Sequence, residues 1–225
     1  MDYSLMKNNK VYISGEVVSE PTFSHEVYNE GFYEFELKVS RLSVAYDIIP
    51  VTISERLMSI NNIKVGSRIS GTGQFRSYNK LEDGKSKLLL TVFLREVLPY
   101  DENANPNVIE INGFVCKEPV FRTTPFNREI SDVLLAVNRS YNKSDYLPCI
   151  AWGRNARFVR EFKVGDRVNV VGRIQSREYQ KKIGDEVVTR VAFEVSLNKI
   201  ELVKEEIELD TITTSAGVLE NYYVR

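Results

Sequence analysis

An internal repeat constrains the fold of this chain more than any other feature of its sequence. A shift of 98 positions aligns residues 11–56 with residues 109–154 without a gap, and 13 of the aligned pairs are identical. About three identities would be expected by chance from average composition. The identities include Glu20-Pro21-x-Phe23 with Glu118-Pro119-x-Phe121, and after one inserted residue Gly73 aligns with Gly172. We therefore predict two related domains, each of ordinary domain size.

A polar segment with two prolines separates the two copies. The residues from Pro99 to Asn107 show no hydrophobic periodicity, which is typical of a linker. We predict a first domain over residues 1–99, a linker over 100–107, a second domain over 108–203 and a C-terminal tail over 204–225.

Each copy has the pattern of a small β-barrel. In the second copy, β-branched or alternating segments occur at 108–115, 133–137, 146–152 and 167–174, and residues 155–162 have helical spacing of apolar side chains. The matching helix of the first copy is expected near residues 55–60, and polar hairpins are expected at 79–87 and 180–186. Three strands, a short helix and two more strands are the order of an OB-fold, a five-stranded Greek-key barrel. We predict an all-β chain of two tandem OB-folds, each with one short helix.

Charge is distributed unevenly along the chain. The formal net charge is −1, but residues 108–203 hold 16 Lys and Arg against 12 Asp and Glu, whereas residues 1–100 hold 12 of each. A basic second half favours a polyanionic partner. No segment has the length and hydrophobicity of a membrane span or a signal peptide, so we expect a cytosolic protein without membrane contact. Cys116, Cys149 and His25 form no metal-ligand pattern, and we expect neither a metal nor a cofactor.

The second copy resembles the bacterial single-stranded-DNA-binding protein family. The resemblance runs from Ile111 to about Val203 and rests on INGFVCKEPVFRTTP, LLAVNRSY, DYLPCIAWGRNARFV and FKVGDRVNVVGRIQSREY, in that order. The first copy is similar to the same family more weakly, in VYISGEVVSEPTF, VSR and VGSRISGTGQFRSY. The resemblance implies sequence-independent binding of single-stranded DNA in replication, recombination or repair, without catalysis or a cofactor.

Four aromatic residues of the second copy match the stacking positions of that family: Tyr141, Tyr146, Trp152 and Tyr179. Unstacked bases can lie on such rings whatever their sequence. Strand parity supports the assignment independently, because Tyr146 and Trp152 are six residues apart and share a face of the strand. The opposite face is expected to carry Leu147, Cys149 and Ala151.

Cations of the second copy are the candidate phosphate contacts. Arg173, Gln175 and Arg177 share the strand parity of Tyr179, and we predict that this row faces the nucleic acid. Further candidates are Arg139, Arg154, Lys181 and Lys182. Two alternatives stay open: Arg154 simply begins the helix, and Arg139 and its counterpart Arg41 form a structural ion pair in each copy.

The first copy does not repeat these aromatic residues. The counterparts of Tyr141, Tyr146 and Trp152 are Ser43, Ile48 and Ser54, and only Tyr78 lies near the fourth-strand stacking position. We predict that the first copy has lost most base stacking and serves assembly, strand guidance or contact with a partner.

The resemblance also implies an assembly and a location. The family builds its binding unit from four OB-folds, so two folds per chain imply a homodimer of a cytoplasmic, nucleoid-associated protein. Members of the family end in an acidic tip that docks replication and repair enzymes, whereas this sequence ends in Tyr222-Tyr223-Val224-Arg225. Contacts with replication or repair proteins are therefore not expected to use such a tip.

Two other functions remain open. The chain could be an OB-fold accessory or interaction module, primosome-like or encoded by a mobile element. It could also bind single-stranded RNA, because stacking surfaces do not report the 2′-hydroxyl group. An enzyme is not expected, since the sequence has no phosphate-binding Gly-x-x-x-x-Gly-Lys loop and His25 has no nucleophilic partner.

Overall fold

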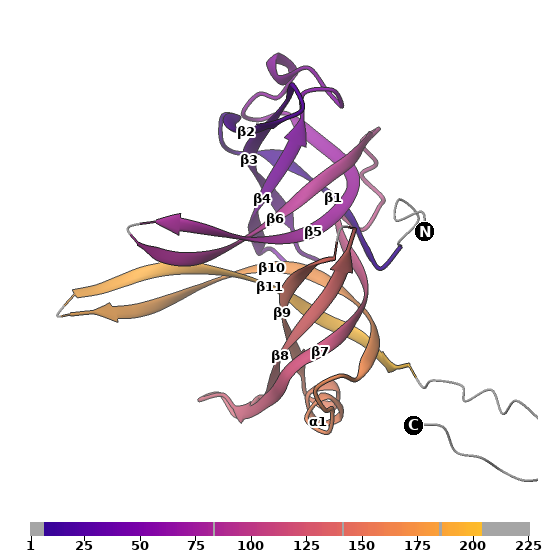
Figure 1. Ribbon diagram of the computed structural model, residues 1–225, viewed down its shortest axis with the longest axis vertical. Coiled ribbons are helices and arrows are strands. Elements are labelled where there is room, and N and C mark those ends of the chain that lie inside the picture. Colours follow the sequence, from indigo (N-terminus) through magenta and orange to yellow (C-terminus); the bar gives the residue numbers. More distant parts are fainter. Residues whose placement is uncertain (1–6, 83, 141, 185, 204–225) are drawn as a thin grey trace, which may run out of the picture.

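Alternating apolar residues build two β-barrels, which follow one another along the long axis of the molecule (Figure 1). The computed structural model describes residues 7–82, 84–140, 142–184 and 186–203. The first barrel contains β1 (Asn9–Val17), β2 (Thr22–Val27), β3 (Glu30–Ser40), β4 (Tyr46–Ser54), β5 (Arg68–Glu82) and β6 (Lys85–Leu98). The second contains β7 (Asn107–Thr123), β8 (Glu129–Arg139), β9 (Lys143–Trp152), α1 (Arg154–Val159), β10 (Arg167–Ile183) and β11 (Glu186–Leu202).

The strand order confirms the predicted architecture. The order is β10-β11-β9-β8-β7-β1-β5-β6-β4-β3-β2, and the additional pairings β10–β7 and β1–β3 close the two barrels. Each barrel thus has five strands with one parallel pair, β4 with β6 and β9 with β11. In the first barrel β2 adds a sixth strand at the outer edge, whereas in the second barrel β7 continues through two bulges over the equivalent residues.

The helices differ between the two copies. In the second barrel α1 buries Ala156 and Val159, and Phe162 is buried just after it, as the spacing predicts. The helix expected near residues 55–60 does not form, and a 3-10 helix of three residues, Ile60–Asn62, takes its place. The local sequence explains this difference: Ser54 accepts a hydrogen bond from the N–H of Arg56, which favours a turn, and Asn residues follow Ile60.

Two glycines shared by both copies of the repeat lie at register shifts in the sheet. Gly73 and Gly172 occupy equivalent bulges, in which β5 passes over β6 and β10 over β11. A Cβ atom at either position would collide with a backbone carbonyl of the neighbouring strand, that of Phe93 or Ser196. The repeat therefore keeps glycine at both sites for a steric reason.

The two barrels are joined along their first strands. β1 and β7 pair antiparallel from Asn9 opposite Ile111 to Ile13 opposite Asn107. In the centre of this register Val11 lies opposite Ile109, which is its counterpart under the 98-residue shift. The pairing is therefore symmetric about this point, and it makes one continuous sheet of both barrels.

Reciprocal hydrogen bonds extend this pseudo-twofold arrangement. The N–H of Ser77 donates to Asp145 at 2.8 Å, and the N–H of its counterpart Ser176 donates to Asp47 at 2.8 Å. Both carboxylates are buried and each accepts across the boundary between the barrels. Each barrel thus donates one serine N–H to the equivalent aspartate of the other barrel. The two bonds together fix the orientation of one barrel relative to the other.

Two long hairpins leave the barrels on the same side. The β5–β6 and β10–β11 hairpins both project to the left in Figure 1, and α1 lies at the opposite end of the second barrel from the junction. Their turns contain Gly84 and Gly184, both with positive φ. No helix in the described parts of the chain is long and apolar enough to cross a membrane.

Candidate nucleic-acid interface

The strand β9 presents two aromatic side chains on the outside of the second barrel. The exposed fractions of Tyr146 and Trp152 are 47% and 39%, whereas Leu147, Cys149 and Ala151 are buried in the core. Alternation along the strand explains the division, because the barrel interior takes every second residue. An exposed indole ring on a rigid strand is available to a flat, apolar ligand.

The strand β10, which is separated from β9 by β11, contributes a polar row to the outside of the second barrel. Gln175 lies opposite Glu194 of β11 and donates to its carboxylate at 2.7 Å, and Arg177 approaches the same carboxylate at 3.5 Å. Gln175 is only 6% exposed, so it does not belong to the exposed residues of this row. It holds the neighbouring side chains of Arg173 and Glu194 by hydrogen bonds. Arg177 is exposed and lies 5.9 Å from the ring of Tyr179, which continues the row into the hairpin.

Arg139 and Arg173 lie at the boundary between the barrels. Arg139 is 3.4 Å from Asp145, and its counterpart Arg41 binds Asp47 through two hydrogen bonds of 2.6 and 2.7 Å. The ion pair considered from the sequence is therefore present in both copies. Arg173 crosses the boundary and donates to Asp47 at 3.2 Å. The side chains of Arg41, Arg139 and Arg173 are each more than a quarter exposed.

The two buried carboxylates differ in their electrostatics. Burial alone would raise the pKa of Asp47, but the hydrogen bonds from Arg41 and from the Ser176 N–H hold this pKa below its usual value. Burial raises the pKa of Asp145 above its usual value, because the Ser77 N–H and the charge of Arg139 offset the lost solvation only in part. Asp47 and Asp145 therefore have similar positions in the two barrels, but their pKa values are shifted in opposite directions.

Of the remaining residues predicted from the sequence, the structure describes the side chains of Arg154 and Lys182. Arg154 is exposed and is the first residue of α1, and Lys182 is exposed near the tip of the β10–β11 hairpin. Tyr141 and the side chain of Lys181 lie outside the part of the chain that the structure describes. Trp152 and Tyr146 share the outside of β9, and Gln175 and Arg177 lie on β10 beyond the intervening β11, whereas Tyr179 and Lys182 belong to the projecting hairpin.

The first barrel carries a different aromatic group on its equivalent face. Ser54 replaces Trp152, but Phe32 lies opposite Ser54 on β3, and its ring centroid is 5.5 Å from that of Phe93 on β6. Arg76 and Arg95 lie 4.3 and 5.7 Å from the Phe93 centroid. Comparison with the second copy did not reveal Phe93, because the matching position there is Ser196. A search for Arg and Phe of equal strand parity on β5 and β6 would have found it.

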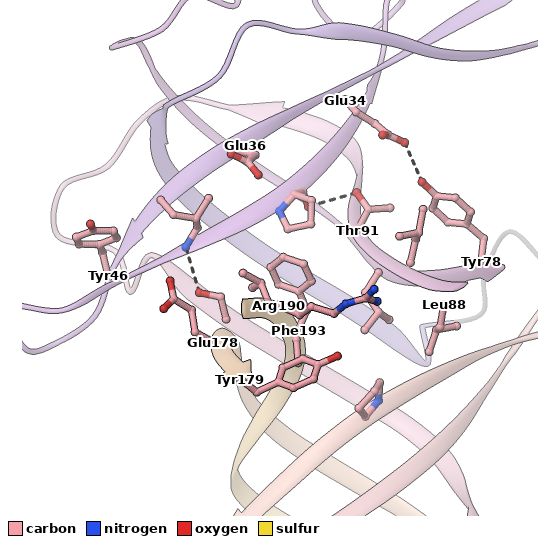
Figure 2. A pocket seen from close by; sticks show the side chains of 18 residues that line it. Glu34, Glu36, Tyr46, Tyr78, Leu88, Thr91, Glu178, Tyr179, Arg190 and Phe193 are labelled. Atoms are coloured by element: carbon pink, nitrogen blue, oxygen red, sulfur yellow. Dashed lines mark hydrogen bonds between the residues drawn. The ribbon is translucent and has the colours of Figure 1, made fainter. Parts of the chain in front are cut away.

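A groove of about 1080 Å³ lies between the first barrel and the β10–β11 hairpin. Figure 2 shows Tyr46, Tyr78 and Tyr179 around it, with Glu34, Glu36 and Glu178 among the lining side chains. The Tyr78 hydroxyl donates to Glu34 at 3.0 Å, and burial together with this carboxylate raises the pKa of Tyr78 to about 12. The carboxylates make the groove unfavourable for a phosphate backbone.

Comparisons with known proteins agree with these observations. The model of the single-strand binding protein family matches residues 106–203, which form the second barrel. Single-stranded DNA-binding protein A of Bacillus subtilis is 34% identical over 96 residues, which are 39% of this chain and 56% of that protein. Single-stranded DNA-binding protein 3 of Streptococcus agalactiae is 32% identical over 96 residues, which are 39% of this chain and 70% of that protein.

The match to the first of these relatives thus spans little more than half of its length. Among solved structures, the single-stranded DNA binding protein from Thermus aquaticus superposes with a TM-score of 0.70 at 19% identity. The superposition covers 88% of this chain and 94% of that one. The likeness therefore extends over both barrels and supports the tandem fold.

Proposed function

Because the chain belongs to the single-strand binding protein family, we propose that it binds single-stranded DNA without sequence preference, mainly through the outer face of the second barrel. The observation that carries the proposal is the exposed ring of Trp152 on β9, with the exposed Arg177 on β10 of the same barrel. No other tryptophan is present in the sequence.

The proposed mechanism divides the binding energy between rings and cations. Bases that leave the stack lie on Trp152 and Tyr146, and each stacked base contributes about 1–3 kcal/mol. Arg177, Arg154 and Lys182 neutralise phosphates, and Arg139 and Arg173 do so with their exposed parts while remaining paired with Asp145 and Asp47. Gln175 holds Arg173 and Glu194 in place beneath the strand.

Sequence-independent binding suits protection of single strands during replication, recombination or repair. Ring faces stack on any base, and the guanidinium groups are proposed to bind phosphates, which every nucleotide carries. The same contacts would accept RNA. Competition between oligo-dT and oligo-U for the intact chain distinguishes the two ligands.

We further propose that two chains associate to place four barrels in one particle. The support is a set of apolar side chains exposed on the two hairpins, which include Leu88, Val187 and Val191. Exposed valines of this kind on a projecting hairpin are typical of an interface. Sedimentation equilibrium should give twice the chain mass of 25.9 kDa, and Val187→Glu with Val191→Glu should shift it towards the single chain.

The direct test of strand binding uses the fluorescence of Trp152. Titration of the intact chain with oligo-dT should quench this emission, and the apparent affinity should fall steeply as salt is raised. Unchanged emission at saturating oligo-dT, as judged by an independent binding assay, would place the strand elsewhere. Absence of binding in both assays would refute the proposed function as a whole.

A further inference from the structure

Three arginines lie near one another where the first barrel meets the second, and two of them lie over the ring of Phe93. Arg76 comes from β5, Arg95 from β6 and Arg139 from β8 of the second barrel, and we call them the Phe93 arginines. Arg76 and Arg95 both approach the Phe93 ring, whose quadrupole attracts cations.

The charge of this group is not balanced by nearby carboxylates. The carboxylate next to it is Asp145, which is 1% exposed and pairs with Arg139 at 3.4 Å. Within the described residues, neither Arg76 nor Arg95 forms an ion pair, and the Nε atom of Arg76 is buried without a hydrogen-bond acceptor. Burial and the charges of Arg95 and Arg139 lower the pKa of Arg76 to about 10.

The pseudo-twofold arrangement provides an internal comparison. At the equivalent place Arg41 and Arg173 both bind Asp47, so charge is better balanced there. The counterpart of Arg76 is Gln175, and the bulge position that holds Arg95 in the first barrel holds Asn198 in the second. The fold therefore does not require arginine at positions 76 and 95, because the second barrel forms the same bulge and strand pairs with glutamine and asparagine there.

We infer that Arg76, Arg95 and Arg139 form a binding site for a backbone phosphate of single-stranded nucleic acid, which extends the strand path onto the first barrel. A phosphate oxygen would accept from the Arg76 guanidinium and offset the repulsion among the three cations. Phe93 positions Arg76 and Arg95 through its ring. The inference rests on the proposed function, and it gives the first barrel a share in binding despite its missing tyrosines and tryptophan.

Continuity with the stacking face favours a phosphodiester over a free phosphate. The N–H of Tyr146 donates to the hydroxyl of Ser77 at 2.7 Å, and Ser77 is the residue after Arg76. A strand that passes Tyr146 therefore reaches the boundary between the barrels beside the Phe93 arginines. A single OB-fold covers about 4–16 nucleotides, so only a longer oligonucleotide would reach both surfaces.

The test compares two oligonucleotide lengths in the intact chain, with Trp152 emission as the readout for the second barrel. Arg76→Gln with Arg95→Asn introduces the residues that the second barrel has at these positions. The double variant should bind dT of about 8 nucleotides as the parent chain does. It should bind dT of about 35 nucleotides roughly tenfold more weakly, with the slope of log Kd against log salt reduced by about 1.4.

Arg160→Gln is the matched control, because Arg160 also lies over a phenylalanine ring, at 5.1 Å from Phe121, and its loss removes one positive charge elsewhere. Unchanged affinity and salt slope for the long oligonucleotide in the folded double variant would overturn the inference. Arg95→Asn alone repeats the test at an exposed side chain, where a slope reduced by about 0.7 is expected. If the parent chain binds neither length, the proposed function fails instead, which is a distinguishable result.

Discussion

Val11 lies directly opposite Ile109, the residue that replaces it in the second copy. An antiparallel pair centred on two equivalent residues places the barrels about an approximate twofold axis. Every position at the boundary therefore has an equivalent, and differences in the contacts of two equivalent positions show where the two copies have diverged.

Asp47→Asn should destabilise the chain more than Asp145→Asn. Either asparagine can still accept the serine N–H bond, but only Asp47 binds two arginines. Hydrogen bonds to charged groups contribute about 1.5–3 kcal/mol, so we expect a loss of about 2 kcal/mol for Asp47→Asn and a smaller loss for Asp145→Asn. Urea unfolding monitored by circular dichroism measures both, and equal losses would contradict the expectation.

The same two variants should respond to pH in opposite directions. The pKa of Asp47 is lowered on folding, so its contribution to stability is present above the unfolded pKa, near 4, and is lost as pH falls through the lower folded value. The pKa of Asp145 is raised, so ionisation of Asp145 reduces stability as pH rises from the unfolded towards the folded value. The loss of unfolding free energy caused by Asp47→Asn should thus be larger at pH 7 than at pH 3. The loss caused by Asp145→Asn should be smaller at pH 7 than at pH 3. Unfolding curves at both pH values decide the signs.

Trp152→Ala should weaken oligo-dT binding by about 1–3 kcal/mol, because it removes one stacking surface. The side chain is 39% exposed, and the neighbouring core residues Leu147 and Ala151 point the other way. Fluorescence anisotropy with a labelled oligonucleotide measures the loss, since the variant has no tryptophan. Tyr28→Ala removes an exposed ring on the β2–β3 turn and serves as the control, for which affinity should not change.

Gly172→Ala should destabilise the second barrel by about 1–3 kcal/mol, because the added methyl group collides with the Ser196 carbonyl on the neighbouring strand. Gly31→Ala is the control, since its Cβ would meet the side-chain carboxylate of Glu55, which can move. Thermal unfolding of both variants gives the comparison. A Gly172→Ala chain as stable as the control would show that the bulge relaxes without cost.

The repeat and the strand parity predict most of the architecture from sequence. Both depend on local alternation, which is why the exposure of Trp152 and the burial of Leu147 agree with expectation. The burial of Gln175 and the engagement of Arg173 by Asp47 could not be derived in this way. The partner of Arg173 is 126 residues away and belongs to the other barrel, so its position follows from the docking of the barrels.

Arg139 was among the predicted phosphate contacts, but Phe93, Arg76 and Arg95 were missed for a related reason. Matching each position to the family's stacking sites shows that an aromatic residue is lost at Ser54. It does not detect the aromatic residue gained at Phe93, which lies on a different strand. The missing helix near residue 55 is a smaller failure: the helical pattern holds in one copy, and a serine that bonds to the backbone was enough to replace it with a turn in the other.

Gln74 and Arg76 of the first barrel stand in the reverse order of Arg173 and Gln175 in the second, and in both pairs the arginine donates to the glutamine at 2.8 Å. In an assembly of identical chains, a single substitution would appear on both sides of the axis. Here the two copies are encoded separately within one chain, so a mutation can alter one side while the other keeps its chemistry. Because one gene encodes both barrels, a difference between their surfaces is inherited with the chain. The two ends of a bound strand can therefore contact different side chains.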